Sequence, residues 1–512
     1  MRHLLRKLFI AALLCAALPC LATPQARDGN DLWIIPEESG WGANIFHQGN
    51  TLFVSLFVYG PDGRARWYTA SDLVGTEAPL GDRPTIYGGP LYESTGPAFS
   101  GPFDPARVTR RQVGMMNVEF GSETYTTGVP RRYAMLYYEV DGVQVRKQAY
   151  AFSFGAIGLT GSYTGFVSNA NGAREELTMN VTLNDRAFTM TTSGPTGTCT
   201  YTGQKIPQGS VFDVQGTYAC GNAASRPFFL TGVDVTRHGF TAAFYADGLA
   251  WSNMAGERMS SAIRGDGYST DLWFPPNESG WGLNIIEQGD TLFGTMFVYD
   301  SAGQPRWYSA SNLTYEQCAP PDSGSDCWGR YRGALVESTG PYFGTTFNAS
   351  AVQRRIVGTM TMDFFGNDTA YLDYSIDGAT VTRKQVRRYA FRANSLAGTY
   401  AGHILAMSGN SDRGMQTGPM TIEVSESGTA ITMTMRGNKG TCTMRGTRFQ
   451  YGRQVLASGP YDCGGAAFGQ MSIMDVYVTS KGFTGRVDFG TQPGVNEFYP
   501  IGRIEAARTT AP

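Results

Sequence analysis

The sequence lacks the features that mark the commoner enzymes and nucleic-acid-binding proteins. Charged residues make up only 16 % of the chain and the formal net charge is −2, so no basic excess would attract nucleic acid or an anionic membrane. No CxxC, HExxH, GxSxG, GxxxxGK[ST] or EF-hand pattern occurs. We therefore expect no metal, no cofactor and no nucleic-acid partner.

Long apolar runs are also absent beyond the first residues. A basic start, MRHLLRK, precedes the apolar stretch LFIAALLCAALPCLA, which is typical of a signal peptide, here with cleavage after Ala22. A lipoprotein with Cys20 as its first mature residue is the alternative, although Leu18 and Pro19 stand where small residues are preferred. No apolar run reaches the roughly 20 residues of a transmembrane helix. The sequence thus predicts a signal peptide over 1–22, no transmembrane segment in the mature chain, and a periplasmic or extracellular location.

The cysteines beyond this signal number six, an even number that favours disulfides in an exported protein. Cys199 and Cys220 lie in GTCT and YACG, and the related motifs GTCT and YDCG hold Cys442 and Cys463, each 243 residues later. This spacing predicts the bonds Cys199–Cys220 and Cys442–Cys463, and elimination leaves Cys318–Cys327. A zinc site is the weaker alternative, because no CxxC occurs and the histidines are scattered.

The cysteine repeat belongs to a duplication of the whole chain. Trp33 and the RWY at 66–68 recur 240 residues later, as Trp273 and the RWY at 306–308. Each half has a Trp-rich front module and a back module with one cysteine pair. The predicted modules are front modules over 30–155 and 270–393, and back modules over 158–265 and 396–505.

The local pattern is that of strands throughout. Runs of β-branched and aromatic residues alternate with turn signals such as Gly49-Asn50, Asp141-Gly142 and Asp377-Gly378, and glycine accounts for 65 of 512 residues. No stretch beyond the signal peptide has helical periodicity. We expect an all-β protein, built of antiparallel β-barrel or β-sandwich modules in two duplicated halves.

The stretch DLWIIPEESGWGANIFHQGNTLF recurs as DLWFPPNESGWGLNIIEQGDTLF and raises the main functional question. Read as strands, one side of it is aliphatic and predicts a core, whereas the other side carries amides, hydroxyls and aromatic rings. These residues are either core anchors or a face that stacks on sugar rings and fixes them by hydrogen bonds. On the second reading the ligand-binding residues are Trp41, Asn44, Gln48, Tyr59 and Trp67, with Trp281, Asn284, Gln288, Tyr299 and Trp307 in the second half.

Catalysis has few candidate groups. Only His47, His238 and His403 lie beyond the signal peptide, and none recurs in the other half, which excludes a Ser-His-acid triad common to both. Carboxylates that recur could cleave a glycosidic bond as acid and base; the candidates are Glu38, Glu93, Glu278 and Glu337. The stronger alternative is that they form salt bridges, with the arginine pairs at 110–111 and 354–355 as partners.

The string ESGWGLNIIEQGDTLFGTMFVYDSAGQPRWYSAS resembles a repeat of uncharacterised exported bacterial proteins, with SGWG, a Gln-Gly turn, an aromatic strand and a Trp-Tyr ending in the same order. Both front modules match, which is about half of the chain. The resemblance implies export and β structure, and it brings no activity with it.

We therefore expect an exported binding protein without catalytic activity, for a glycan or another extended or cell-surface ligand, because two linked weak sites gain avidity. Two alternatives stay open. One is a carboxylate-dependent hydrolase or lyase acting on polysaccharide, and the other is an envelope scaffold or assembly factor that binds a protein partner. The oligomeric state is not predicted.

Overall fold

The structure is a computed structural model of the 512-residue chain. It describes residues 29–76, 85–124, 130–155, 158–168, 174–235, 239–246, 252–259, 269–318, 327–406, 418–437, 440–464, 468–479, 482–490 and 502–509. The predicted signal peptide lies outside these residues. The described residues form four closed antiparallel barrels of eight strands, which confirms the all-β fold with duplicated halves.

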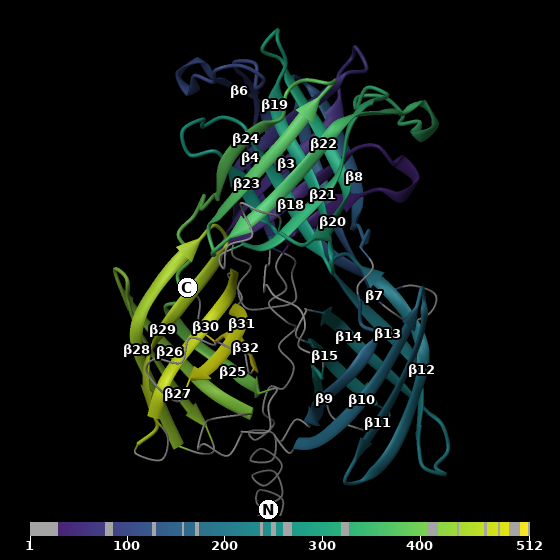
Figure 1. Cartoon of the computed structure of the whole chain (residues 1–512), viewed down its shortest axis with the longest axis vertical. Helices are drawn as coiled ribbons and strands as arrows, with labels where there is room; N and C mark the ends of the chain where they lie inside the picture. The colour runs from purple at the N-terminus through teal and green to yellow at the C-terminus, as the bar shows by residue number, and fades with distance from the viewer. Residues whose placement is uncertain are drawn as a thin grey trace, which may run out of the picture.

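Two of the barrels correspond to the front modules (Figure 1). Front barrel 1 consists of β1 (Asp31–Ile34), β2 (Gly42–Gln48), β3 (Thr51–Tyr59), β4 (Ala65–Thr76), β5 (Ile86–Thr95), β6 (Thr109–Thr124), β7 (Pro130–Val140) and β8 (Val143–Ala151), with short 3₁₀ turns η2 (Pro36–Glu38) and η3 (Pro105–Arg107). Front barrel 2 consists of β17 (Asp271–Phe274), β18 (Gly282–Gln288), β19 (Thr291–Tyr299), β20 (Pro305–Glu316), β21 (Cys327–Thr339), β22 (Gln353–Phe365), β23 (Thr369–Ile376) and β24 (Thr382–Arg388), with η4 (Ala349–Ala351).

The back modules form the other two barrels. Back barrel 1 consists of β9 (Gly161–Ser168), β10 (Arg174–Asn184), β11 (Ala187–Gly194), β12 (Gly197–Gln208), β13 (Val211–Cys220), β14 (Arg226–Val235), β15 (Gly239–Ala246) and β16 (Ser252–Arg258). Back barrel 2 consists of β25 (Gly398–Ala406), β26 (Gly418–Ser427), β27 (Ala430–Gly437), β28 (Gly440–Tyr451), β29 (Gln454–Asp462), β30 (Phe468–Thr479), β31 (Gly482–Gly490) and β32 (Gly502–Arg508).

Each strand pairs with its neighbour in sequence, and the first strand of every barrel pairs with the last. Tight turns make this meander possible. In the predicted Asp-Gly turns both residues have positive φ, 48° and 84° at Asp141-Gly142 and 50° and 78° at Asp377-Gly378. Two successive positive φ values define the type I′ turn, whose twist matches that of the flanking strands.

The two front barrels pack side by side and share one continuous hydrophobic cluster, whereas each back barrel has a cluster of its own. Figure 1 shows the front pair at the top and both back barrels below it, on the same side. The molecule is therefore a joined pair of front barrels that carries two separate back barrels.

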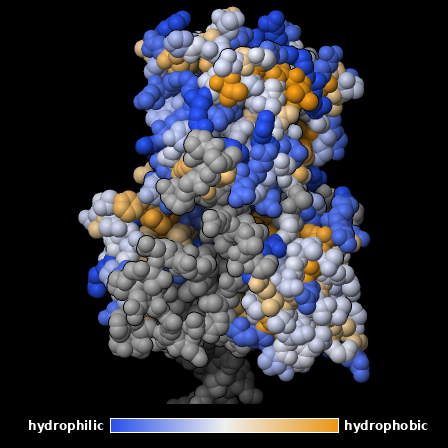
Figure 2. Space-filling model, in the orientation of Figure 1, coloured by the Kyte–Doolittle hydropathy of each residue, from blue (hydrophilic) through white to orange (hydrophobic). Residues whose placement is uncertain are grey.

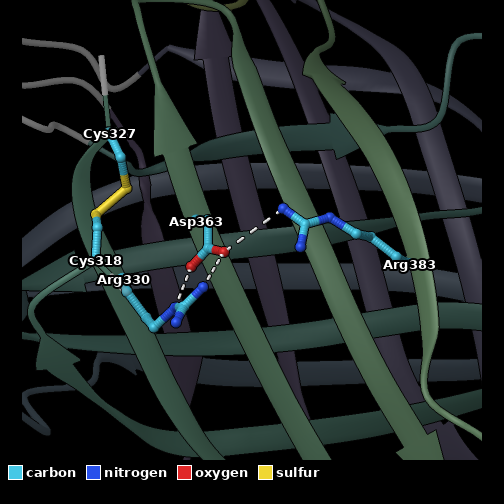
Figure 3. The surroundings of a disulfide bond; sticks show 5 residues. All are labelled: Cys318, Cys327, Arg330, Asp363 and Arg383. Carbon is cyan, nitrogen blue, oxygen red and sulfur yellow. Dashed lines mark hydrogen bonds and ion pairs between the residues drawn. A yellow bond between two sulfur atoms is a disulfide. The ribbon is translucent and has the colours of Figure 1, made fainter. Parts of the chain in front are cut away.

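The three predicted disulfides are all present. Cys199–Cys220 and Cys442–Cys463 each join neighbouring strands near the end of a back barrel, where Cys199 and Cys220 are direct cross-strand partners. Cys318–Cys327 closes the loop between β20 and β21 on front barrel 2 (Figure 3). Three disulfides indicate an oxidising, non-cytoplasmic environment. Among the described residues, no helix is long and apolar enough to cross a membrane.

Beside the Cys318–Cys327 bond, a carboxylate is held on the barrel wall by two arginines (Figure 3). Asp363 has no exposed side-chain surface; Arg330 Nε lies 2.7 Å from its Oδ1 and Arg383 3.9 Å from its Oδ2. This cluster ties β21, β22 and β24 together on the outside of front barrel 2. The equivalent wall of front barrel 1 has Ile86 and Glu119 opposite each other, at the positions of Arg330 and Asp363.

Candidate functional site

All ten residues predicted to bind a ligand are buried, each with at most 4 % of its surface exposed. They are Trp41, Asn44, Gln48, Tyr59 and Trp67, and Trp281, Asn284, Gln288, Tyr299 and Trp307. None of them can meet a ligand while the two halves stay together. Their contacts show that most of them join one half of the chain to the other.

Strand β2 has one side in the core of its own barrel and the other side against the opposite barrel. Ala43 and Ile45 point into front barrel 1 and join its core, as the aliphatic side was predicted to do. Asn44 and Gln48 point out of the barrel, on the side with amides, hydroxyls and rings. That side is not a wet surface, because front barrel 2 covers it: the Asn44 amide donates to Thr295 Oγ1 over 3.3 Å.

The tryptophan of each RWY motif reaches into the opposite front barrel. Trp67 Nε1 donates to the carbonyl of Val298 and Trp307 Nε1 donates to the carbonyl of Val58, both over 3.0 Å. The Trp67 ring centroid lies 5.5 Å from that of Tyr299, and the Trp307 centroid 5.7 Å from that of Tyr59. The contacts therefore come in pairs, as expected for a self-complementary surface that occurs once in each half.

Gly40, the first glycine of SGWG, has a specific steric role. It has a φ of 133°, and a Cβ atom at this position would lie 2.7 Å from Val352 of front barrel 2. Its counterpart Gly280 has a φ of 122° and would clash in the same way with Val108 of front barrel 1. A side chain at either position would strain the backbone and push the barrels apart.

The indole N–H groups of the SGWG tryptophans bond within their own half. Trp41 Nε1 donates to Glu38 over 2.9 Å, and Trp281 Nε1 donates to Glu278 over 3.0 Å. Lys147 lies 2.7 Å from the same Glu38 carboxylate. These bonds fix the turn that presents the SGWG glycine to the opposite barrel.

Each repeated glutamine holds the linker that follows the opposite front barrel. Gln48 donates to the carbonyl of Tyr389 and accepts from the amide of Arg392, over 3.1 and 3.0 Å. Gln288 donates to the carbonyl of Phe152 over 2.8 Å and accepts from the amides of Phe154 and Gly155 over 2.8 and 3.2 Å. Since these linkers lead into the back barrels, the glutamines help to place each back barrel under the joined front pair.

Replacing Gln288 with alanine should speed up amide hydrogen exchange at Phe154 and Gly155 by about tenfold, since each lost hydrogen bond is worth about 1 kcal/mol or more. Exchange at Arg392 should not change, because Gln48 holds that amide. The matched Gln48→Ala variant should give the reverse pattern. Hydrogen exchange read by mass spectrometry on the full chain can test this, and equal effects on both linkers would contradict it.

Phenylalanines that the sequence did not single out also cross between the halves. Phe99, from the loop after β5, packs against Tyr308 and Tyr374 of front barrel 2, with centroids 5.9 and 5.7 Å apart. Phe343 packs in the same way against Tyr68 and Tyr138 of front barrel 1, at 6.0 and 6.2 Å. The repeated string ESTGP before each phenylalanine was the available signal for this exchange.

The four candidate catalytic carboxylates all form ion pairs. Glu93 and Glu337 lie 2.8 and 2.7 Å from Arg111 and Arg355, which are the arginine partners predicted for them. Glu38 and Glu278 pair instead with lysines of the last strand of their own barrel, Lys147 and Lys384. Each carboxylate thus has a cationic partner from its own barrel, which is the arrangement of a structural salt bridge.

One buried carboxylate in each half lies where the front barrel meets its back barrel. Asp271 accepts from Arg388 Nη1 over 3.0 Å and from the amide of Arg453 over 3.2 Å. Asp31 accepts from the amide and hydroxyl of Ser210, over 3.0 and 3.3 Å. In both halves a glycine of positive φ, Gly209 or Gly452, lets the hairpin of the back barrel approach the carboxylate.

The two carboxylates differ in their charge partners. Ala151 and Ser210 stand in the first half where Arg388 and Arg453 stand in the second. Burial therefore raises the pKa of Asp31 from 3.8 to about 7, with hydrogen bonds from Ser210 and Leu32 and the charge of Arg132 acting against it. Burial also raises the pKa of Asp271, although Arg388 and Arg453 oppose the rise.

A second feature that the sequence analysis missed lies on the outer wall of back barrel 1. Three strands, β10, β11 and β12, carry side chains that form a grid of three by three through their cross-strand pairing. The rows are Thr182, Thr189 and Thr202; Asn180, Thr191 and Thr200; and Thr178, Ser193 and Thr198. We call these nine residues the hydroxyl grid. Alternating threonines in three successive strands were the signal for it.

No protein-family model and no curated protein matches the chain. The resemblance of the SGWG repeat to exported bacterial proteins therefore stays a prediction.

Proposed function

We propose that this chain is an exported binding protein without catalytic activity, and that its ligand is a glycan or another extended ligand. The main support is that the front barrels share a single core, so they act as a base that holds two back barrels on the same side. Two weak sites held on one base gain avidity for an extended ligand without any new contact. The four candidate catalytic carboxylates all form ion pairs, which favours a binding protein over a hydrolase.

The ligand is expected on the back barrels and not at the SGWG repeats. Because the repeated tryptophans and amides are buried between the halves, the exposed walls of the back barrels are the better candidates. The signal peptide over 1–22 and the periplasmic or extracellular location belong to the same proposal.

The test is a titration of the mature full-length chain with soluble polysaccharides, followed by isothermal calorimetry and by affinity electrophoresis. We expect saturable binding to at least one polysaccharide, with a Kd in the micromolar to millimolar range expected of weak carbohydrate sites, about −4 to −8 kcal/mol. Tryptophan fluorescence should hardly change on binding. No saturable binding by either method would overturn the proposal, and release of new reducing ends would favour the hydrolase instead.

A further inference from the structure

The outer wall of back barrel 1 has an unusual composition for an exposed sheet. The hydroxyl grid contains eight hydroxyl side chains and one amide and no charged residue, and all nine are exposed except the half-buried Thr191. Its neighbours Ser162, Thr164 and Thr217 on β9 and β13 extend it with three further hydroxyls. In Figure 2 the surface over β10–β12, at the lower right, is mostly pale, between the hydrophilic and hydrophobic ends of the scale.

Strand propensity explains part of this composition, since threonine is favoured on strands and threonine pairs across strands are stabilising. It does not explain why back barrel 2 differs. The equivalent grid of back barrel 2 lies on β26, β27 and β28, where the same nine positions include three charged residues, Glu423, Arg436 and Arg445. Glu423 and Arg436 form an ion pair there at 2.7 Å. The same fold in the same chain thus accepts charges at this wall.

The grid is also rigid and regular. A β-branched threonine has few χ1 rotamers on a strand, so its hydroxyl is held in place at little further entropic cost on binding. Strand geometry spaces the hydroxyls by about 4.8 Å between strands and about 6.8 Å along a strand. The side chains of Thr182, Thr189, Thr200 and Thr202 are exposed, so their hydroxyl groups are open to solvent.

These properties select one class of ligand. An anionic polysaccharide or a phosphate group is normally bound by arginine or lysine, and the grid has neither. Protein interfaces are enriched in aromatic residues, methionine and arginine, which the grid also lacks. An uncharged polysaccharide presents repeated hydroxyls that both donate and accept, and threonine hydroxyls do the same.

We propose that the hydroxyl grid of back barrel 1 is a binding surface for an uncharged polysaccharide. The inference deepens the proposed function and depends on it, because it assigns one of the two linked sites, the one on back barrel 1, to a single wall of that barrel. Back barrel 2, with Glu423, Arg436 and Arg445 on its equivalent wall, has no such surface.

The test uses the full-length mature chain and matched lysine variants, titrated with a soluble β-glucan, a mannan and a xylan, and with alginate as an anionic control. Thr189→Lys/Thr200→Lys should weaken binding of the uncharged polysaccharide by about tenfold or more, because two ammonium groups would have to be desolvated. Thr432→Lys/Thr443→Lys places the same charges on the equivalent wall of back barrel 2 and should leave binding unchanged. Unchanged circular dichroism and thermal midpoints establish that both variants fold.

A transfer of the grid provides a second measurement. The triple variant Glu423→Asn/Arg436→Ser/Arg445→Thr gives the equivalent wall of back barrel 2 the residues of the hydroxyl grid at eight of the nine positions. At the ninth position Ser425 stands in place of Thr182 and already carries a hydroxyl. The triple variant should add one site for an uncharged oligosaccharide to each chain. If the wild type binds a glycan and both lysine variants retain full affinity, the grid is not the site, although the proposed function stands. If the wild type binds no polysaccharide, both proposals fail. If it binds only alginate, the proposed function stands, but the hydroxyl grid is not a site for an uncharged polysaccharide.

Discussion

Replacing Asp271 with asparagine should destabilise the protein by about 3–5 kcal/mol, because it leaves the buried guanidinium of Arg388 without its carboxylate. The Arg388 side chain is only 1 % exposed and cannot turn to solvent without disturbing the junction of front barrel 2 with back barrel 2. The measurement is urea unfolding of the full chain at pH 8, followed by circular dichroism. A shift of less than about 1 kcal/mol would contradict the prediction.

The same substitution at Asp31 is the matched control, and its effect should reverse with pH. The difference between a pKa of 3.8 in the unfolded chain and about 7 in the folded chain corresponds to about 4 kcal/mol against folding once Asp31 is ionised. The folded state binds more protons between these values, so this part of the stability is lost as the pH rises from about 4 to about 7.

Asparagine cannot ionise but offers only one acceptor oxygen, which costs about 1 kcal/mol. Above pH 8 the substitution removes the cost of about 4 kcal/mol for ionising the buried Asp31, which is larger than the cost of the lost acceptor. Asp31→Asn should therefore be more stable than the wild type there by about 2–3 kcal/mol. At pH 4 the carboxyl is already protonated, and the variant should be slightly less stable than the wild type. If Asp31→Asn were destabilising at both pH values, the ionised form of Asp31 would not be disfavoured in the folded chain.

Replacing Asn44 with arginine should separate the two front barrels. Asn44 has no exposed surface and points from the wall of front barrel 1 into front barrel 2, so a guanidinium there would be buried without a partner. We expect a cost of about 3–5 kcal/mol, which is large enough to open the interface while the barrel itself stays folded. Small-angle X-ray scattering should show a larger radius of gyration.

Tryptophan quenching gives a second readout of the same opening. In the wild type the six tryptophans whose side chains the structure describes are all at most 4 % exposed, so acrylamide should quench them weakly. In Asn44→Arg the quenching should rise, since Trp67 and Trp307 become accessible. Asn117→Arg, at an exposed position on the outer wall of the same barrel, is the control and should change neither measurement. An unchanged radius with Asn44→Arg would mean that the halves are held together by other contacts.

SGWG occurs once in each half because each copy packs against the front barrel of the other half. The glycine of one copy makes room for a valine of the opposite barrel, and the tryptophan of each RWY motif donates to a carbonyl of the opposite barrel. The reading of these residues as core anchors is the one that agrees with their burial. The surface that remains open to a ligand has a different composition, with hydroxyls in place of aromatic rings.

The sequence by itself determined the features that local or covalent chemistry controls. Alternating side chains and Asp-Gly turns indicated antiparallel strands, because side-chain alternation and positive φ are properties of the chain over a few residues. The constant shift of 243 residues between the cysteine motifs indicated the bonds Cys199–Cys220 and Cys442–Cys463. These features do not depend on how the modules pack.

Only the tertiary structure decided which outer walls are covered and which are open. A strand such as β2 shows two distinct sides in its sequence, but a side of amides and rings looks the same whether it faces water or another barrel. The partner of Asn44 is 251 residues away, and no local pattern contains that distance.

The hydroxyl grid was hidden for a related reason, since nine residues of three strands become one surface only through the cross-strand register of β10, β11 and β12. Long-range packing thus changed the place of the proposed site, from the repeated tryptophans to the wall of back barrel 1.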